Sequence, residues 1–152
     1  MSPVRVLTAD DHETYRRLLA GLARVAFGAE VVVSLSHDGN DALARLKGEP
    51  IDILLTDPHM PGASGVEVAR AARGVRRETR VLLVTRDATE DELREAARAG
   101  VFRCIRKPFD IGFVVAVLQQ AARTRLRRRV FRTDRLRLCG ASSQRSNPSI
   151  TA

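Results

Sequence analysis

The sequence predicts an α/β protein with a doubly wound parallel sheet, and three features of the chain support this class. Five short segments rich in Val, Ile and Leu recur along the sequence. A longer amphipathic segment follows each of them, which is typical of repeated βα units. The short segments are almost continuously apolar, as expected for strands that are covered on both faces. The predicted strands are residues 4–9, 30–35, 51–56, 80–85 and 101–105.

Helices are predicted between these strands from the spacing of apolar residues and from the polar residues that precede each helical segment. The first covers about residues 12–27, and the second covers 40–47. The third and fourth begin at Ser64 and Thr89, because each of these residues is followed by a glutamate at the spacing of a capping box. Asp110 caps a fifth helix, whose apolar residues are Phe113, Val114, Val117, Leu118 and Ala121.

Length and apolar content argue for one domain that does not cross a membrane. A chain of 152 residues matches one ordinary domain with a short appendage. Its longest uncharged apolar run, residues 111–118, is far shorter than the roughly 20 residues needed to span a bilayer. The charged N-terminal segment lacks the apolar stretch of a signal peptide. The expected location is therefore the cytoplasm.

Charge divides the chain into two unequal parts. Residues 1–122 hold 17 Lys and Arg against 17 Asp and Glu, whereas residues 123–152 hold nine Arg against Asp134 alone. The whole net charge of +8 therefore belongs to the C-terminal part. We expect a domain over residues 1–122 and, over residues 123–152, an Arg-rich helical extension followed by a disordered tail.

The Arg-rich segment 123–138 has several interpretations. It can be a solvated continuation of the last helix, or it can contact the backbone of DNA or RNA without sequence preference. An anionic lipid surface or an acidic protein would suit the same charge. The 22 residues that follow Val130 are too few for a separate helix-turn-helix domain. Output is therefore expected through protein contacts, or through a module of a longer protein.

Five polar residues follow or end predicted strands and are expected at one rim of the sheet. Ligands of doubly wound sheets bind beyond the carboxyl ends of the strands. Three carboxylates at that rim repel one another, and a pair about 4 Å apart costs up to about 4 kcal/mol at an effective dielectric of about 20. Mg²⁺ would offset this cost, and a lysine and a hydroxyl would help to bind a phosphoryl group. The residues are Asp10, Asp11, Asp57, Thr85 and Lys107.

Four segments of the chain carry a family resemblance: VLTADDH (6–12), LLTDPHMPGASG (54–65), VLLVT (81–85) and CIRKPF (104–109). Over about residues 4–122, the chain resembles the receiver domain of two-component response regulators, in particular the single-domain chemotaxis-type receivers. The resemblance implies a flavodoxin-like fold, with five parallel strands in the order 2-1-3-4-5 and helices on both faces.

The resemblance implies roles for the acidic residues. Asp57 would accept a phosphoryl group from a sensor histidine kinase or a histidine phosphotransfer protein. Asp10, Asp11 and Asp57, together with the backbone carbonyl of His59, would hold Mg²⁺. The protein would then signal to a downstream protein target by a conformational change, and its self-association as a homodimer stays open.

Lys107 and Thr85 receive roles from the same resemblance. Lys107 would contact the phosphoryl oxygens, and its peptide bond to Pro108 would be cis. Thr85 would move towards the phosphoryl group after transfer and act as a switch. Composition supports Lys107 independently, since the chain has 24 Arg and only one other lysine, Lys47.

Three residues depart from the family pattern. Cys104 occupies the switch position that is usually aromatic, Arg86 replaces a small residue, and Pro58 follows Asp57 without an N–H donor. These residues favour an alternative, a pseudo-receiver that acts as a constitutive protein- or nucleic-acid-binding module through its Arg-rich tail. The complete set of rim residues favours phosphorylation-controlled signalling.

A true phosphohydrolase is a third functional class. Enzymes with an aspartyl nucleophile typically place a second aspartate two residues later, where this chain has His59. We therefore expect that the protein is not an enzyme, and that slow self-dephosphorylation of Asp57 only ends the signal.

Overall fold

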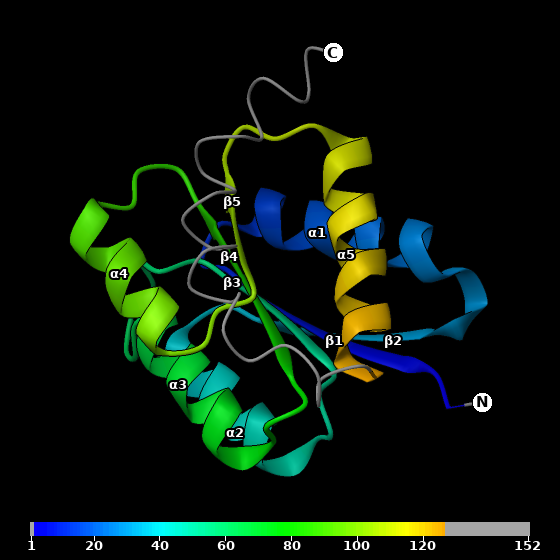
Figure 1. The fold of residues 1–152 in the computed structure, drawn as a ribbon, viewed down its shortest axis with the longest axis horizontal. Helices are drawn as coiled ribbons and strands as arrows, with labels where there is room; N and C mark the ends of the chain where they lie inside the picture. The colour runs from blue at the N-terminus through cyan, green and yellow to red at the C-terminus, as the bar shows by residue number, and fades with distance from the viewer. Residues whose placement is uncertain (1, 127–152) are drawn as a thin grey trace.

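The computed structural model of the protein describes residues 2–126. Its centre is a sheet of five parallel strands in the order β2-β1-β3-β4-β5, as the resemblance implied (Figure 1). The strands are β1 (Val4–Ala9), β2 (Val31–Ser36), β3 (Ile53–Thr56), β4 (Arg80–Thr85) and β5 (Arg103–Arg106). The predicted fold class is confirmed.

Helices cover both faces of the sheet (Figure 1). Helices α1 (Glu13–Phe27) and α5 (Ile111–Leu126) pack against each other on one face. On the other face lie α2 (Gly39–Gly48), α3 (Gly65–Val75) and α4 (Glu90–Arg98). A short 3-10 helix, Gly28–Glu30, joins α1 to β2 and was not predicted.

Alternation along β3 divides its side chains between the two layers of the core. Ile53 and Leu55 belong to the cluster beneath α1 and α5, whereas Leu54 belongs to the cluster beneath the other helices. Successive side chains of a strand point to opposite faces, so one continuous apolar segment fills both layers. Each fully buried Leu or Ile contributes about 1.5–3 kcal/mol. The strand is thereby fixed in the sheet, and it ends directly before Asp57.

The helix starts that were predicted from capping residues are confirmed. Ser64 and Thr89 each accept a hydrogen bond from the backbone N–H of the glutamate three residues later, and the side chain of that glutamate accepts one from the cap residue. Asp110 accepts a bond of 2.8 Å from the backbone N–H of Phe113 at the start of α5. Asp38 caps α2 in a similar way, which was not predicted. Each cap satisfies donors that the first helical turn leaves unpaired.

Strand β3 begins later than predicted because the chain turns just before it. The backbone N–H of Ile51 donates a hydrogen bond of 3.0 Å to the carbonyl of Glu49, so Ile51 belongs to the turn that leaves α2. Ile51 is nevertheless buried in the core, which explains why its apolar character resembled that of a strand residue.

Helix α5 ends the described part of the chain at Leu126. The guanidinium of Arg80 donates a hydrogen bond of 2.7 Å to the Thr124 carbonyl and lies 5.1 Å from the centroid of the Phe102 ring. The first residues of the predicted Arg-rich extension therefore belong to α5. The rest of the 123–138 segment and the predicted disordered tail lie outside the described residues.

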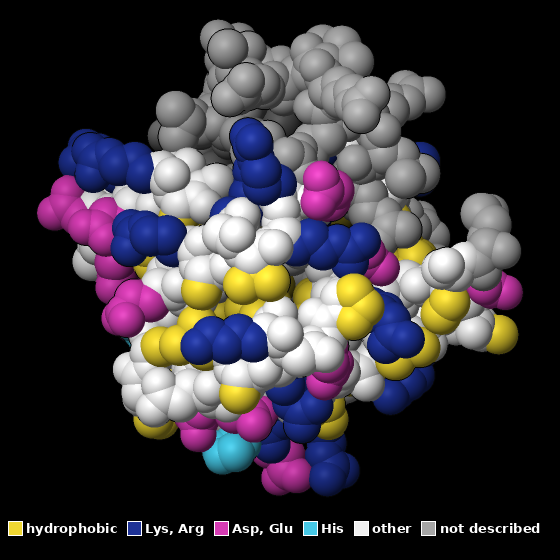
Figure 2. Space-filling view, turned by 90° about the horizontal axis from the view of Figure 1, so that it is seen from below, with side chains coloured by type: hydrophobic (Ala, Val, Ile, Leu, Met, Phe, Trp, Pro, Cys, Tyr) yellow, Lys and Arg dark blue, Asp and Glu magenta, His cyan; other side chains and the backbone are white. Residues whose placement is uncertain are grey.

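Charged side chains of both signs share the surface of the described domain. Figure 2 shows Lys and Arg interspersed with Asp and Glu around a hydrophobic area on one face. On α4, Arg94 pairs with Glu90 at 3.3 Å and with Asp91 at 3.0 Å. Over residues 2–126, every helix is too short or too polar to cross a membrane.

Candidate functional site

Lys107 forms the centre of the candidate site. Its Nζ lies 2.8 Å from Oδ2 of Asp10 and 2.7 Å from Oδ2 of Asp57. The side chains of Lys107 and Asp10 are 3% and 1% exposed, and that of Asp57 is 12% exposed. Charges buried this deeply are tolerated only when they are paired and hydrogen bonded. The structure thus brings three of the predicted site residues into one ionic cluster.

The carboxyl ends of neighbouring strands position this cluster. Asp57 follows β3, and its backbone N–H donates a hydrogen bond of 3.1 Å to the carbonyl of Ala9 at the end of β1. Asp10 is the next residue after that strand. Lys107 follows β5, and its N–H donates a bond of 2.8 Å to the carbonyl of Thr85 at the end of β4. Backbone pairing therefore holds the three residues at one rim.

Gly65 allows the loop after Asp57 to close tightly. A Cβ at this position would collide with the carbonyl oxygen of Asp57 and would lie 2.7 Å from Cα of Pro58. The Gly65 N–H donates a hydrogen bond of 3.0 Å to the Pro58 carbonyl. Helix α3 therefore starts directly against the loop that holds Asp57.

An open pocket of about 250 Å³ adjoins the ionic cluster. Backbone groups fix the second oxygen of each buried carboxylate: the N–H of His12 donates to Oδ1 of Asp10 at 2.9 Å, and the N–H of His59 donates to Oδ1 of Asp57 at 2.7 Å. Asp11, in contrast to Asp10, is exposed. The pocket is lined by Asp11, His12, Asp57, His59, Arg86, Asp87 and Lys107.

The oxygen donors at this pocket suit a magnesium ion. Asp11 and Asp57 supply carboxylates, and His59, whose carbonyl was predicted as a ligand, lines the same pocket. Mg²⁺ is usually bound through one or two carboxylates and keeps several waters. In the part of the chain that the structure describes, no three His, Cys, Asp or Glu side chains are grouped closely enough to hold a metal by themselves. The donors therefore form an open site. Next to it, one carboxylate oxygen of Asp10 is hydrogen bonded to Lys107.

Electrostatics keep Lys107 positively charged. Burial by itself lowers the pKa of its ammonium group, but the hydrogen bonds to Asp10 and Asp57 outweigh this effect and hold the pKa above its ordinary value. The group is therefore a permanent cation at neutral pH. Its peptide bond to Pro108 is cis, as the resemblance implied.

The two residues predicted as the switch do not line the pocket. Thr85 is buried, and its Oγ1 accepts a hydrogen bond of 3.3 Å from the backbone N–H of Asp87. Cys104 is also buried, and it lines a small apolar hollow together with Thr85 and with Leu93 of α4. Thr85 and Cys104 are therefore neighbours, but on the side that faces α4.

The other departures from the family pattern have clear places in the structure. Arg86 lines the pocket with Asp57 and Lys107, and Asp87 adds an acidic side chain that was not predicted there. Pro58 has no N–H, but the hydrogen bond that reaches the Asp57 carboxylate from this loop comes from His59 instead.

The His59 side chain makes a contact that the sequence did not predict. Its Nε2 lies 2.6 Å from Oε1 of Glu92 in α4, and its Nδ1 lies 3.6 Å from Oδ1 of Asp87. The hydrogen bond to Glu92 raises the pKa of His59 and lowers the pKa of Glu92. The only available signal was indirect: Glu92 stands in the first turn of the helix after β4, the strand beside β3.

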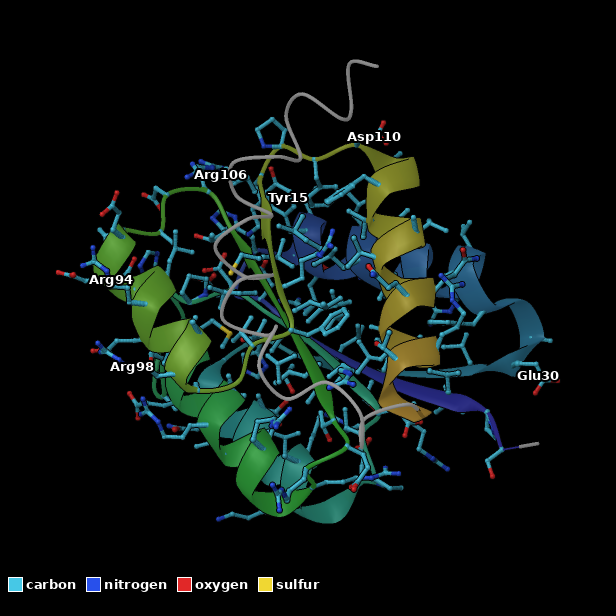
Figure 3. The ribbon with its side chains drawn as sticks, in the orientation of Figure 1. Tyr15, Glu30, Arg94, Arg98, Arg106 and Asp110 are labelled. Carbon is cyan, nitrogen blue, oxygen red and sulfur yellow. The ribbon has the colours of Figure 1, made fainter. Side chains whose placement is uncertain are left out.

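Tyr15 lies in the first turn of α1 and was not predicted as a site residue. In the structure, the Nζ of Lys107 lies 4.1 Å from the centroid of its ring. The ring of Phe109 lies 6.0 Å from that of Tyr15, at an interplanar angle of 58°. Figure 3 shows Tyr15 close to β5, near the loop that leads to Asp110.

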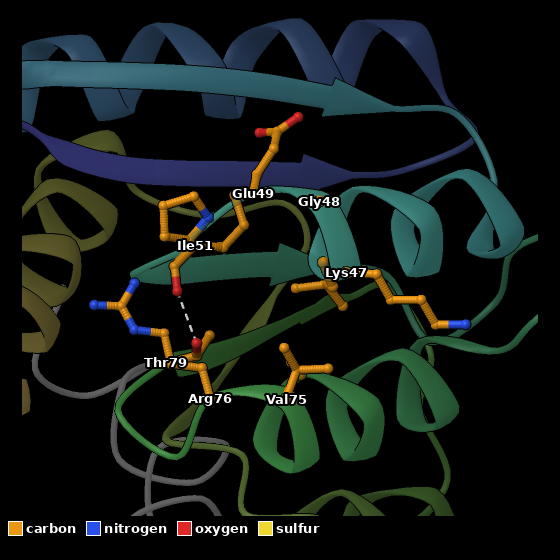
Figure 4. A pocket seen from close by; sticks show the side chains of 10 residues that line it. Lys47, Gly48, Glu49, Ile51, Val75, Arg76 and Thr79 are labelled. Atoms are coloured by element: carbon orange, nitrogen blue, oxygen red, sulfur yellow. Dashed lines mark hydrogen bonds between the residues drawn. The ribbon is translucent and has the colours of Figure 1, made fainter.

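A second pocket, of about 280 Å³, lies at the opposite rim of the sheet (Figure 4). It lies between the ends of α2 and α3, where Oγ1 of Thr79 donates a hydrogen bond of 2.7 Å to the carbonyl of Ile51. Lys47, the other lysine of the chain, lines this pocket. Parallel strands begin at this rim, so the second pocket is separate from the ionic cluster.

Comparison with known proteins identifies the family. The response regulator receiver domain family matches residues 6–119. The chain is 38% identical over 109 residues to the chemotaxis protein CheY of Pseudomonas aeruginosa, which covers 70% of this chain and 86% of that protein. It is also 38% identical over 109 residues to protein-glutamate methylesterase/protein-glutamine glutaminase 5 of Myxococcus xanthus, covering 71% of this chain but only 31% of that longer protein.

A solved structure agrees with this assignment at the level of the fold. The CheY-like response regulator receiver domain protein from Methanospirillum hungatei has a TM-score of 0.76 at 20% identity, covering 84% of this chain and 99% of that chain. In general, receiver domains are signalling domains rather than enzymes. They interact with histidine kinases and with downstream targets. Because the family matches most of the chain, the protein belongs to the CheY-like receiver domains of two-component response regulators.

Proposed function

We propose that Asp57 accepts a phosphoryl group from a phosphohistidine of a sensor histidine kinase or a histidine phosphotransfer protein. The observation that carries this proposal is the position of Lys107, whose Nζ lies within hydrogen-bond distance of both Asp57 and Asp10. Asp57 is the one of these two carboxylates that lines the open pocket. A phosphoryl donor can therefore approach Asp57 from solvent, where the ammonium group of Lys107 already lies beside the carboxylate.

The chemistry requires a positioned carboxylate and a way to offset charge. An oxygen of Asp57 attacks phosphorus, the bond from phosphorus to the histidine nitrogen breaks, and the imidazole leaves with the electron pair. The His59 N–H and the Lys107 ammonium hold the carboxylate in one orientation. The product carries roughly two negative charges, which the ammonium of Lys107 partly neutralises.

Mg²⁺ is the cofactor that this proposal includes. Asp10, Asp11 and Asp57, with the backbone carbonyl of His59, would hold it. The ion would supply positive charge that shields the phosphoryl oxygens from the carboxylates. One oxygen of Asp10 accepts a hydrogen bond from the His12 N–H and the other from Lys107, so the contact with Lys107 would have to change before Asp10 could bind the ion.

The proposed response passes through Thr85 to a downstream protein. The Thr85 hydroxyl lies at the end of β4, next to Cys104 and α4, and a shift towards the phosphoryl group would alter the packing there. Because Cys104 is smaller than the usual aromatic residue, the change would be a repacking against Leu93 rather than a rotation of a ring. Slow hydrolysis of the phosphoaspartate would end the signal.

A constitutive binding module is the second candidate function. Arg86 in the pocket and Cys104 beside Thr85 favour it, since both change positions that a conventional receiver uses to respond. In this case the protein would act without phosphotransfer. It would bind a protein or the nucleic acid backbone through residues 123–138, as a monomer or as a homodimer.

Phosphorylation by a small donor separates the two functions. The protein is incubated with acetyl phosphate in the presence and absence of Mg²⁺, and its intact mass is measured. We expect one added phosphoryl group in the wild type with Mg²⁺ and none in Asp57→Asn. Asp91→Asn is the matched control, because Asp91 is an exposed residue of α4 that pairs with Arg94. A wild-type protein that gains no phosphoryl mass would favour the constitutive module.

A further inference from the structure

The ammonium group of Lys107 has a third neighbour besides its two carboxylates. Its Nζ lies 4.1 Å from the centroid of the Tyr15 ring, well within the range of a cation–π interaction. Tyr15 belongs to α1, whereas Lys107 follows β5, so the contact joins separate elements of the fold. The side chain of Lys107 is 3% exposed, and a desolvated ammonium interacts more strongly with a ring face than an exposed one.

The ring of Tyr15 is itself held in place. Phe109, two residues after Lys107, packs against it with ring centroids 6.0 Å apart and an interplanar angle of 58°. This tilted geometry is a favourable arrangement for two aromatic rings. The segment that carries Lys107 therefore also fixes the aromatic face on which the ammonium lies.

The Tyr15 ring and the two carboxylates interact with Lys107 in different ways, because the carboxylates carry charge and accept its hydrogen bonds. Asp10 and Asp57 are expected to change partners on phosphorylation, because Mg²⁺ would compete with Lys107 for their oxygens and one oxygen of Asp57 would become bonded to phosphorus. The ring is neutral, and its attraction for the ammonium does not use a hydrogen-bond donor of Nζ. It can hold Lys107 before and after transfer.

We propose that Tyr15 is a positioning residue, whose ring keeps the Lys107 ammonium at the rim while its hydrogen bonds pass from the carboxylates to the phosphoryl group. This inference rests on the proposed phosphoacceptor function. The ring face makes the contact, so the phenolic hydroxyl is not required. Tyr15→Phe preserves the interaction, and Tyr15→Leu removes it but keeps an apolar side chain on α1.

Phosphorylation rates with acetyl phosphate and Mg²⁺ test this role. We expect Tyr15→Leu to react about ten-fold more slowly than the wild type, and Tyr15→Phe to stay within about two-fold. Tyr15→Met serves as a second ringless variant if Tyr15→Leu does not fold. A ringless variant as fast as the wild type, or a Tyr15→Phe variant as slow as Tyr15→Leu, would overturn the inference.

Selective labelling of lysine side chains provides a second readout, which tests whether the ring stays beside the ammonium when a phosphoryl mimic binds. The chain has two lysines, so an NMR spectrum shows Lys107 with Lys47 as an internal control. The ring current of Tyr15 should shift the Lys107 signals in the wild type and in Tyr15→Phe but not in Tyr15→Leu. The shift should persist after addition of Mg²⁺ and beryllofluoride, which mimics a phosphoryl group.

The two readouts distinguish this inference from the proposed function. A wild-type protein that gains no phosphoryl group refutes the proposed function and, with it, the role of Tyr15 in transfer. A wild-type protein that is phosphorylated, but whose Lys107 signals are the same with and without the ring, refutes the positioning role alone.

Discussion

Nε2 of His59 lies 2.6 Å from Oε1 of Glu92, and this contact joins the loop after β3 to the first turn of α4. The backbone of His59 holds Asp57, because its N–H donates to the carboxylate at 2.7 Å. The other oxygen of Glu92 accepts a hydrogen bond of 2.8 Å from the N–H of Thr89 at the helix start. One histidine therefore connects the candidate phosphoacceptor to the capping box of α4.

This contact predicts a dependence of stability on pH. The bond to Glu92 raises the pKa of His59 above its ordinary value of 6.5, and the same bond lowers the pKa of Glu92 below its ordinary value of 4.5. The stabilisation is therefore complete between pH 4.5 and pH 6.5. It is lost as the pH rises through the raised pKa of His59, and also as the pH falls through the lowered pKa of Glu92.

Urea unfolding of the wild type and His59→Gln at several pH values measures this effect. The difference in unfolding free energy between the two proteins should be largest between pH 4.5 and pH 6.5 and should shrink in alkaline solution. It should stay below about 1 kcal/mol, because the His59 side chain is 50% exposed. A difference that is the same from about pH 5 to about pH 9 would contradict the prediction.

Replacing Lys107 by methionine should destabilise the fold by about 3 kcal/mol, since it leaves two buried carboxylates without their cation. Millimolar Mg²⁺ should restore part of this loss, because the ion would supply the missing positive charge. Asp57→Asn should cost less, since Lys107 keeps its bond to Asp10. Urea unfolding with and without Mg²⁺ gives all of these values. Equal stability of Lys107→Met and the wild type would show that the two buried carboxylates do not need this cation for the fold to be stable.

A Cβ at Gly65 should disrupt the loop that carries Asp57. In Gly65→Ala the new methyl group would meet the backbone of Asp57 and Pro58, and the unfolding free energy should fall by about 2 to 3 kcal/mol. Phosphorylation by acetyl phosphate should slow as well, since the carboxylate would move. Gly74→Ala, in the same helix and with open space around the new Cβ, is the matched control. It should raise stability by up to about 1 kcal/mol.

Truncation after Leu126 tests the Arg-rich extension. This cut keeps Thr124, whose carbonyl accepts the hydrogen bond from Arg80, and it removes residues 127–152. If the extension binds nucleic acid, the full chain should be retained on DNA at low salt and released as salt increases, whereas the truncated chain should not be retained. Equal retention of both proteins would assign DNA binding to the domain itself.

The sequence determined the fold class and placed the members of the ionic cluster at one rim of the sheet. Short continuous apolar segments such as residues 53–55, alternating with amphipathic segments, favour strands covered on both faces, and parallel strands bring their carboxyl ends to one rim. Asp10, Asp57 and Lys107 follow such strands, so their meeting was predictable without coordinates. The capping boxes at Ser64 and Thr89 were equally predictable, because their partners lie only three residues away.

Only the tertiary structure decided which side chains surround that cluster. The contacts of His59 with Glu92 and of Tyr15 with Lys107 join elements that are distant in sequence, and they depend on how each helix lies on the sheet. A difference of one helical turn would separate either pair, although the hydrophobic pattern would be unchanged. Local sequence therefore placed the charges at the rim, whereas helix packing selected the neighbours that hold them.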